Sequence, residues 1–201
     1  MSSGKACSAL CAALLVLVLA LPISAQEPCK ATVAANDKGQ RIVVLENSYL
    51  RLTARPTMGG VVTSLVHKRS NHDYVGPTQA FFVDLDWSIP QSAKNDYPSQ
   101  DYVFELIENT PERVSLALKS KSRLPPIDWI ELTKTLTLER GCSAILVSQH
   151  YLNHPDSMTP ITVRPWIHHE SSTFGMQTQY FMPLRTGRYE IRPLKDKTDS
   201  K

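Results

Sequence analysis

Alternation of apolar and polar residues at period two is the feature that most restricts what this chain can fold into. The clearest case is the run WIELTKTLTLE at residues 129–139. On an extended strand its residues divide into an apolar face and a threonine face, namely Ile130, Leu132, Leu136 and Leu138 against Thr133, Thr135 and Thr137. No window after residue 25 keeps the apolar period of a helix. The sequence therefore predicts an all-β protein with little helix.

Further runs of strand type recur along the chain. The expected strands cover residues 41–45, 49–54, 61–67, 80–85, 102–108, 113–120, 129–139, 143–152, 161–168, 178–184 and 189–191. The tight connections at residues 108–113 and 139–143 indicate antiparallel hairpins. An antiparallel β-sandwich or barrel is the expected architecture.

Two connections differ from ordinary hairpin turns. The pair Gly59-Gly60 predicts a turn in which the backbone takes positive φ or packs closely against a neighbour, without a ligand role. Residues 86–101 form a long polar and aromatic segment, and loops of that length are typically functional or disordered. This loop is therefore a candidate for part of a binding site.

The first 25 residues predict a secretory signal peptide rather than part of the fold. Lys5 is the only charged residue there, and the apolar run that follows holds about a dozen residues, too few to span a bilayer. Small Ala25 stands at a suitable cleavage position. We expect a secreted or periplasmic protein that begins near Gln26 and has no membrane segment in its mature form.

Residues 26–39 are expected to form an N-terminal arm, residues 40–192 a β domain, and residues 193–201 a charged tail. Without Lys5 the chain has 21 Lys and Arg against 19 Asp and Glu, a net charge near +2. This balance is too weak for a nucleic-acid interface. Cys29 and Cys142 either form one disulfide or stay unpaired, because the sequence does not place their Cα atoms relative to one another.

Four segments, in order, carry a resemblance to a known superfamily. They are ENSYLRLTARPTMGGVVTSLVHKRSNHDYVG, YVFELIENTPERVSLALKS, IELTKTLTLERGCSAILVSQHYLN and TPITVRPWIHHESSTFG. Over residues 40–190 the chain resembles the galactose mutarotase-like superfamily, the β-supersandwich domains of aldose 1-epimerases and many sugar-binding modules. The resemblance implies an all-β antiparallel supersandwich and a carbohydrate ligand. Domains of this superfamily are usually longer, so it also implies an N-terminal portion or shortened member, incomplete at its C-terminus.

The family's enzymes carry a His in the long loop and a catalytic carboxylate on a later strand, and this chain matches neither. Exchange of sugar anomers needs one acid and one base, without a cofactor. On an extended strand His168 and Glu170 share one face, about 6.5–7 Å apart along the strand, and they are the candidate catalytic pair. Alternatively, residues 168–172 are a solvated strand end.

Sugar binding favours aromatic faces together with charged groups that form bidentate hydrogen bonds. Arg164, Trp166 and His168 alternate onto one face of their expected strand, and the long loop adds Trp87 and Tyr97. These residues are the candidate substrate-binding set. The alternative is a core Trp166 covered by the aliphatic part of Arg164.

Other chemistries have less support in the sequence. Trp129 is expected in the core. His150 and His154 lie four apart in a strand and turn, and no HExxH motif or Cys/His quartet occurs, so no metal site is expected.

The main prediction is a secreted, non-catalytic carbohydrate-binding β-sandwich domain. One alternative is an aldose 1-epimerase or another sugar-processing enzyme that uses His168 and Glu170. A second alternative is a structural module that acts through protein contacts.

Overall fold

The computed structural model describes residues 26–77, 80–84, 87–89, 96–125, 127–154, 162–164, 167–168, 179–183 and 186–193. Two antiparallel sheets dominate, and each follows the order of the chain. The five-stranded sheet contains β1 (Lys30–Ala35), β2 (Arg41–Glu46), β3 (Leu50–Arg55), β4 (Val61–His67) and β5 (His72–Asp73). The four-stranded sheet contains β8 (Val103–Asn109), β9 (Arg113–Lys121), β10 (Ile130–Glu139) and β11 (Leu146–Asn153).

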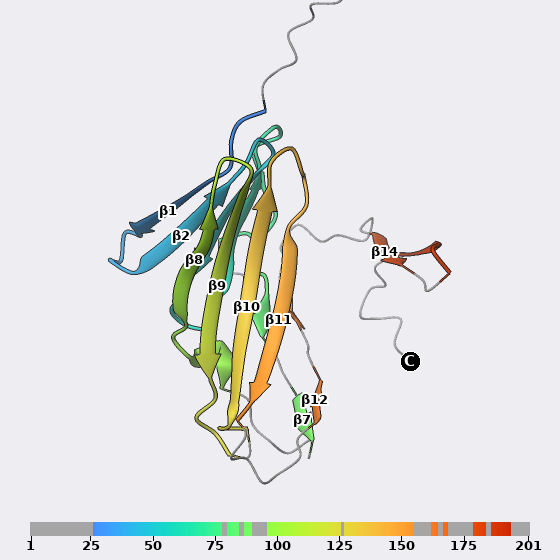
Figure 1. The fold of residues 1–201 in the computed structure, drawn as a ribbon. Helices are drawn as coiled ribbons and strands as arrows, with labels where there is room; N and C mark the ends of the chain where they lie inside the picture. Colours follow the sequence, from blue (N-terminus) through green and yellow to red (C-terminus); the bar gives the residue numbers. More distant parts are fainter. Residues whose placement is uncertain are drawn as a thin grey trace, which may run out of the picture.

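The two sheets lie face to face (Figure 1), which confirms the predicted all-β antiparallel sandwich. The described residues form no closed barrel. Their helical content is one 3₁₀ turn, η1 (Tyr97–Ser99), within the long loop. The N-terminal arm contains a strand that the sequence did not predict, because β1 pairs with β2 from Lys30 opposite Glu46 to Ala35 opposite Arg41.

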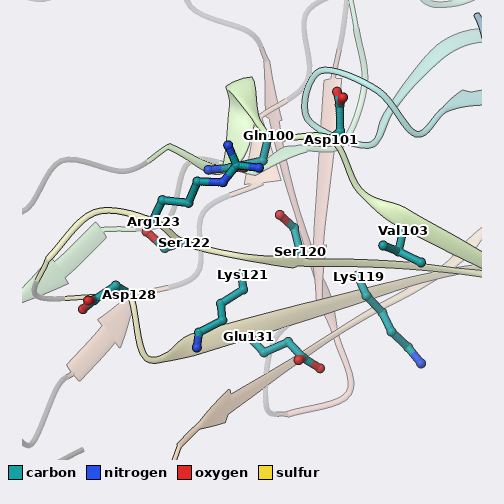
Figure 2. A pocket seen from close by; sticks show the side chains of 10 residues that line it. All are labelled: Gln100, Asp101, Val103, Lys119, Ser120, Lys121, Ser122, Arg123, Asp128 and Glu131. Atoms are coloured by element: carbon teal, nitrogen blue, oxygen red, sulfur yellow. The ribbon is translucent and has the colours of Figure 1, made fainter.

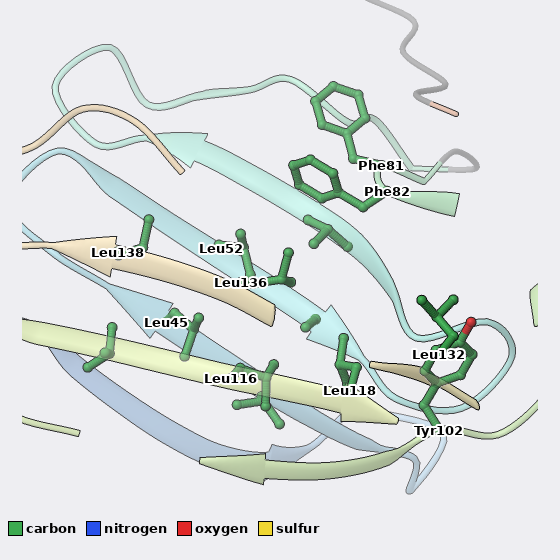
Figure 3. Close-up of a cluster of buried hydrophobic side chains, with 14 of the residues drawn as sticks. Leu45, Leu52, Phe81, Phe82, Tyr102, Leu116, Leu118, Leu132, Leu136 and Leu138 are labelled. Carbon is green, nitrogen blue, oxygen red and sulfur yellow. The ribbon is translucent and has the colours of Figure 1, made fainter. Parts of the chain in front are cut away.

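The core lies between the sheets, where alternate residues of each strand turn inward (Figure 3). In β10 the predicted apolar face is buried, and in β9 Leu116 lies opposite Leu136 and Val114 opposite Leu138. The fully buried leucines are Leu45, Leu52, Leu116, Leu118, Leu132, Leu136 and Leu138. Each such side chain contributes about 1.5–3 kcal/mol by leaving water, so the two sheets stabilise each other.

The Gly59-Gly60 turn has both properties expected from the sequence. Gly59 and Gly60 take positive φ, at 95° and 54°. A Cβ on Gly59 would lie 2.7 Å from the carbonyl oxygen of Pro98, and one on Gly60 would lie 2.8 Å from the Tyr102 ring. The turn therefore needs glycine for its conformation and for the close approach of Tyr102.

Both cysteines are free thiols, so the disulfide alternative is not formed. Cys29 is buried, and its thiol contacts the carbonyl oxygens of Glu112 at 3.6 Å and Leu138 at 3.8 Å. Burial raises the pKa of the Cys29 thiol above its ordinary value. Cys29 anchors the start of the chain by packing rather than by a covalent bond.

Shorter strands pair the long loop with a later part of the chain. They are β6 (Val83–Asp84), β7 (Trp87–Ile89), β12 (Thr162–Arg164) and β13 (Ile167–His168), and a separate hairpin joins β14 (Gln179–Pro183) to β15 (Tyr189–Pro193). The expected strand over residues 161–168 is found as β12 and β13, on either side of residues 165–166.

Candidate functional site

The predicted binding residues come from two segments that pair with each other. β12 lies antiparallel to β7, and β13 lies antiparallel to β6. We call β6, β7, β12 and β13 together the ribbon. Within it Arg164 is opposite Trp87, and His168 is opposite Val83. The structure therefore places the backbone of Trp87 beside that of Arg164, about 75 residues later in the chain, and the backbone of His168 beside that of Val83.

Two members of the predicted site, Trp166 and Glu170, lie outside the described residues. The His168 and Glu170 catalytic pair consequently stays a prediction. Tyr97 differs from its predicted role as a sugar-contacting residue. It is 1% exposed, and its hydroxyl donates a hydrogen bond to the carbonyl oxygen of Ile130 at 2.9 Å. Its ring belongs to the core because η1 turns it inward.

Trp129 departs from its prediction in the opposite direction. It was expected in the core, and it is 41% exposed at the residue before β10. Its backbone carbonyl accepts a hydrogen bond from the amide of His154 at 3.2 Å, which closes the end of the β10–β11 hairpin. Because it precedes the first inward residue of β10, alternation places it on the solvent side.

A buried charged cluster lies where the ribbon meets the four-stranded sheet. Lys134 donates from Nζ to Oδ2 of Asp84 at 2.7 Å and to the carbonyl oxygen of Phe82 at 2.6 Å. Tyr102 donates from its hydroxyl to the same Oδ2 at 2.8 Å, and Gln149 donates from Nε2 to Oδ1 at 2.7 Å. We call Asp84, Tyr102, Lys134 and Gln149 the Asp84 cluster. Its carboxylate accepts three side-chain hydrogen bonds.

Four different elements supply the Asp84 cluster. Lys134 of β10 and Gln149 of β11 are direct cross-strand partners, Asp84 belongs to β6, and Tyr102 immediately precedes β8. The Tyr102 ring also lies 5.5 Å from the Lys134 ammonium, a cation–π distance. Figure 3 shows Tyr102 beside Leu132 at the end of the core. The cluster thereby ties β6, and with it the paired strand β13, to the sandwich.

Burial of this ion pair is costly unless its hydrogen bonds are satisfied. Asp84 and Lys134 are both 0% exposed. Transfer of each charge from water costs several kcal/mol, and only good geometry with further hydrogen bonds offsets that cost. The three additional contacts, from Tyr102, from Gln149 and to Phe82, supply those bonds. This cluster therefore fixes the position of β6 closely.

The Asp84 cluster was not predicted, although the sequence carries a signal for it. Lys134 stands on the apolar face of residues 130–138, with Leu132 and Leu136 on either side at period two. Asp84 similarly interrupts the apolar run AFFVDL. A positive charge in the middle of one apolar run and a negative charge in the middle of another together predict a buried ion pair, since lone charges are almost never buried.

A polar groove of about 730 Å³ opens at the end of the four-stranded sheet (Figure 2). Its lining residues are Gln100, Asp101, Val103, Lys119, Ser120, Lys121, Ser122, Arg123, Asp128 and Glu131. The groove exists because β9 extends beyond β8, the edge strand beside it. The β8–β9 pairing ends at Val103 opposite Lys119, and β9 continues through Ser120 and Lys121 beyond it.

Asp96 organises one wall of this groove. Its carboxylate accepts hydrogen bonds from the Ser122 hydroxyl at 2.6 Å, from the Arg123 amide at 3.0 Å and from the Gln100 side chain. Burial alone would raise the pKa of the Asp96 carboxyl, but these hydrogen bonds outweigh burial and lower the pKa below its ordinary value. Three lining residues are consequently held by one partly buried acceptor group.

A smaller hollow of about 470 Å³ lies beside the five-stranded sheet, lined by Leu50, Leu65, His67, Tyr74, Ser143 and Ile145. Within the described ranges, no group of His, Cys, Asp or Glu is placed to hold a metal ion. In that same part of the chain, no helix has the length and hydropathy needed to cross a membrane.

Comparison with known protein families and with curated proteins finds no match to this chain. Among solved structures, the chain is similar to a TPR-domain containing protein from Parabacteroides distasonis ATCC 8503, with a TM-score of 0.42 and 15% identity. The alignment covers 56% of this chain and 21% of that protein, so the chain spans about a fifth of its length. A likeness at this level carries no argument about function, which has to come from the residues of this chain.

Proposed function

We propose that this protein is a secreted carbohydrate-binding β-sandwich domain and that its ligand site lies on the ribbon. The observation that carries the proposal is the pairing of Arg164 with Trp87 across β12 and β7. These two residues were selected from the sequence for their chemistry alone, and the fold places them on neighbouring positions of one ladder. An aromatic ring for stacking and a guanidinium for bidentate hydrogen bonds are suitable groups for a sugar.

The Asp84 cluster supports this proposal by fixing the base of the ribbon. Asp84 is the Cα partner of Ile167, next to His168, and its carboxylate is bonded to β10, β11 and the residue before β8. A binding site needs neighbouring residues that hold it in place, since ordering a loose segment on binding lowers affinity. A buried ion pair under the ribbon meets that need.

The test is calorimetric titration of the mature protein with a panel of monosaccharides and neutral and acidic oligosaccharides. We expect Arg164→Ala to weaken binding about tenfold to a hundredfold, because a charge-assisted hydrogen bond is lost, and Trp87→Ala to weaken it by removal of a stacking face. Arg51→Ala is the matched control, since Arg51 is exposed on β3 of the five-stranded sheet. Binding by a folded Arg164→Ala variant equal to that of the parent would move the site away from the ribbon.

The same preparation distinguishes binding from catalysis. We expect no acceleration of anomer exchange, followed by NMR with galactose and glucose, because the long loop of this chain lacks the His that the family's enzymes carry there. Acceleration that is lost in His168→Ala and Glu170→Gln would instead establish the epimerase alternative.

A further inference from the structure

We propose that the groove at the end of β9 is a second binding site, specific for a neutral, polyhydroxylated ligand such as an uncharged oligosaccharide. The inference builds on the proposed carbohydrate function but depends on different residues. None of the residues that line the groove belongs to the ribbon. Its volume of about 730 Å³ lies within the range of ordinary ligand pockets, about 300–1,000 Å³.

The first support is that most of the charged side chains that line the groove have no ion-pair partner among the described residues. Lys121, Arg123, Asp128 and Glu131 form no side-chain ion pair within 4.0 Å in the part of the chain that the structure describes. Lys121 and Glu131 are cross-strand partners on β9 and β10, yet their charged ends point apart in Figure 2. Polar groups of both signs thus face the open space of the groove instead of each other.

The second support is the balance of charge, which decides the class of ligand. The groove has three cations, Lys119, Lys121 and Arg123, and an equal number of carboxylates, Asp101, Asp128 and Glu131. A phosphate or sulfate would be repelled by as many carboxylates as there are cations to attract it. A metal ion would likewise be repelled by as many cations as there are carboxylates to bind it. A ligand with vicinal hydroxyls suits both, because each hydroxyl donates to a carboxylate and accepts from a cation.

The third support is that part of the lining is already ordered. Gln100, Ser122 and the Arg123 backbone are held by Asp96, so this wall does not have to be rearranged when a ligand enters. Among the described lining residues none is aromatic, and Val103 is the only apolar one. Its ligand is therefore recognised through hydrogen bonds, which distinguishes it from the aromatic site proposed for the ribbon.

The experiment combines a glycan array of neutral and acidic glycans with NMR titration of the ¹⁵N-labelled mature protein. Each neutral glycan that binds on the array is titrated, and inorganic phosphate is titrated in parallel. The variants are Lys121→Ala, which removes a donor, and Glu131→Ala, which removes an acceptor. Both side chains are exposed, so the fold is kept, and a melting curve checks this. Lys38→Ala, at an exposed lysine in the turn between β1 and β2, is the matched control.

We expect a neutral glycan to shift the amides of residues 119–123 and 128–131. Each groove variant should weaken that binding about tenfold to a hundredfold, and Lys38→Ala should leave it unchanged. If phosphate or acidic glycans alone shift these amides, or if no glycan does, the proposal is overturned. Arg164→Ala separates the two sites. Glycan binding that is lost in Arg164→Ala and kept in Lys121→Ala supports the ribbon site and contradicts the groove site. Binding that is lost in Lys121→Ala and kept in Arg164→Ala supports the groove site and contradicts the ribbon site.

Discussion

Replacement of Lys134 by methionine tests whether the Asp84 cluster holds the ribbon to the sandwich. Methionine keeps the length and volume of the side chain on β10 and removes the ammonium group. Asp84 then stays fully buried, and among the described residues Tyr102 and Gln149 remain as side-chain donors to it. Removal of one partner from a buried ion pair costs about 3–5 kcal/mol, because the other charge is left uncompensated.

That cost is large compared with the total stability of an ordinary domain, about 5–15 kcal/mol. For a chain of this size, each kcal/mol lowers the melting temperature by about 2–4 °C, so we expect a decrease of about 6–20 °C. The free energy of unfolding would be measured by urea titration, with the melting temperature by circular dichroism. Lys119→Met is the control, since Lys119 is exposed on neighbouring β9 and pairs with Glu105 at 3.3 Å only at the surface. We expect its cost to stay below about 1 kcal/mol.

A double variant completes the test. In Asp84→Leu with Lys134→Met, both charges are gone, and replacement of a buried pair by apolar side chains is often neutral or stabilising. The double variant should therefore be more stable than the sum of the two single changes predicts, by about 0.5–3 kcal/mol or more. Additive costs, or a loss below about 1 kcal/mol in Lys134→Met alone, would show that the pair does not hold β6 in place.

Three further predictions concern other parts of the chain. Asp96→Asn should lower stability at neutral pH. Because the folded pKa of Asp96 lies below its ordinary 3.8, its contribution is complete above about pH 4 and is lost as the pH falls through the folded pKa, so urea curves of variant and parent should converge in acid. Gly60→Ala should destabilise far more than Gly39→Ala in melting curves: both have positive φ, but only at Gly60 would the new Cβ meet the Tyr102 ring, and equal costs would contradict this contact. Exported protein should begin near Gln26 by N-terminal sequencing, whereas a soluble cytosolic chain that starts at residue 1 would refute secretion.

The strands could be predicted from the sequence where each one buries a single face. β4 coincides with the expected residues 61–67, and β10 begins one residue after the start of the expected 129–139. Period-two alternation is a local signal in the sequence, and it matches the structure directly where every second residue of the strand faces the core. β1 escaped prediction for the same reason, because its sequence KATVAA lies at a sheet edge with nearly every residue exposed and has no buried face to display.

The candidate site was predictable in its residue types and not in its arrangement. Arg164 and Trp87 were chosen for their chemistry, but their pairing joins segments about 75 residues apart, and no local period encodes it. Tyr97 was assigned to a ligand because aromatic residues in a polar loop are usually exposed, yet tertiary packing turned it into the core. Lys134 and Asp84 were not predicted, because a buried charge is recognisable only together with its partner, and these two lie 50 residues apart in the sequence.

The chain-order arrangement of the two large sheets has a consequence for how the protein folds. Every pairing within them joins strands that are consecutive along the chain, so each hairpin closes a short loop. The β6–β13 pairing instead closes a loop of about 80 residues. The conformational entropy of that loop is lost before the contacts between the two strands can compensate for it. Amides of β9 and β10 should therefore gain protection early in pulsed hydrogen exchange during refolding, and Val83 and Asp84 should gain it in the final phase. Simultaneous protection of both would mean that the long closure, rather than the hairpins, sets the rate of folding.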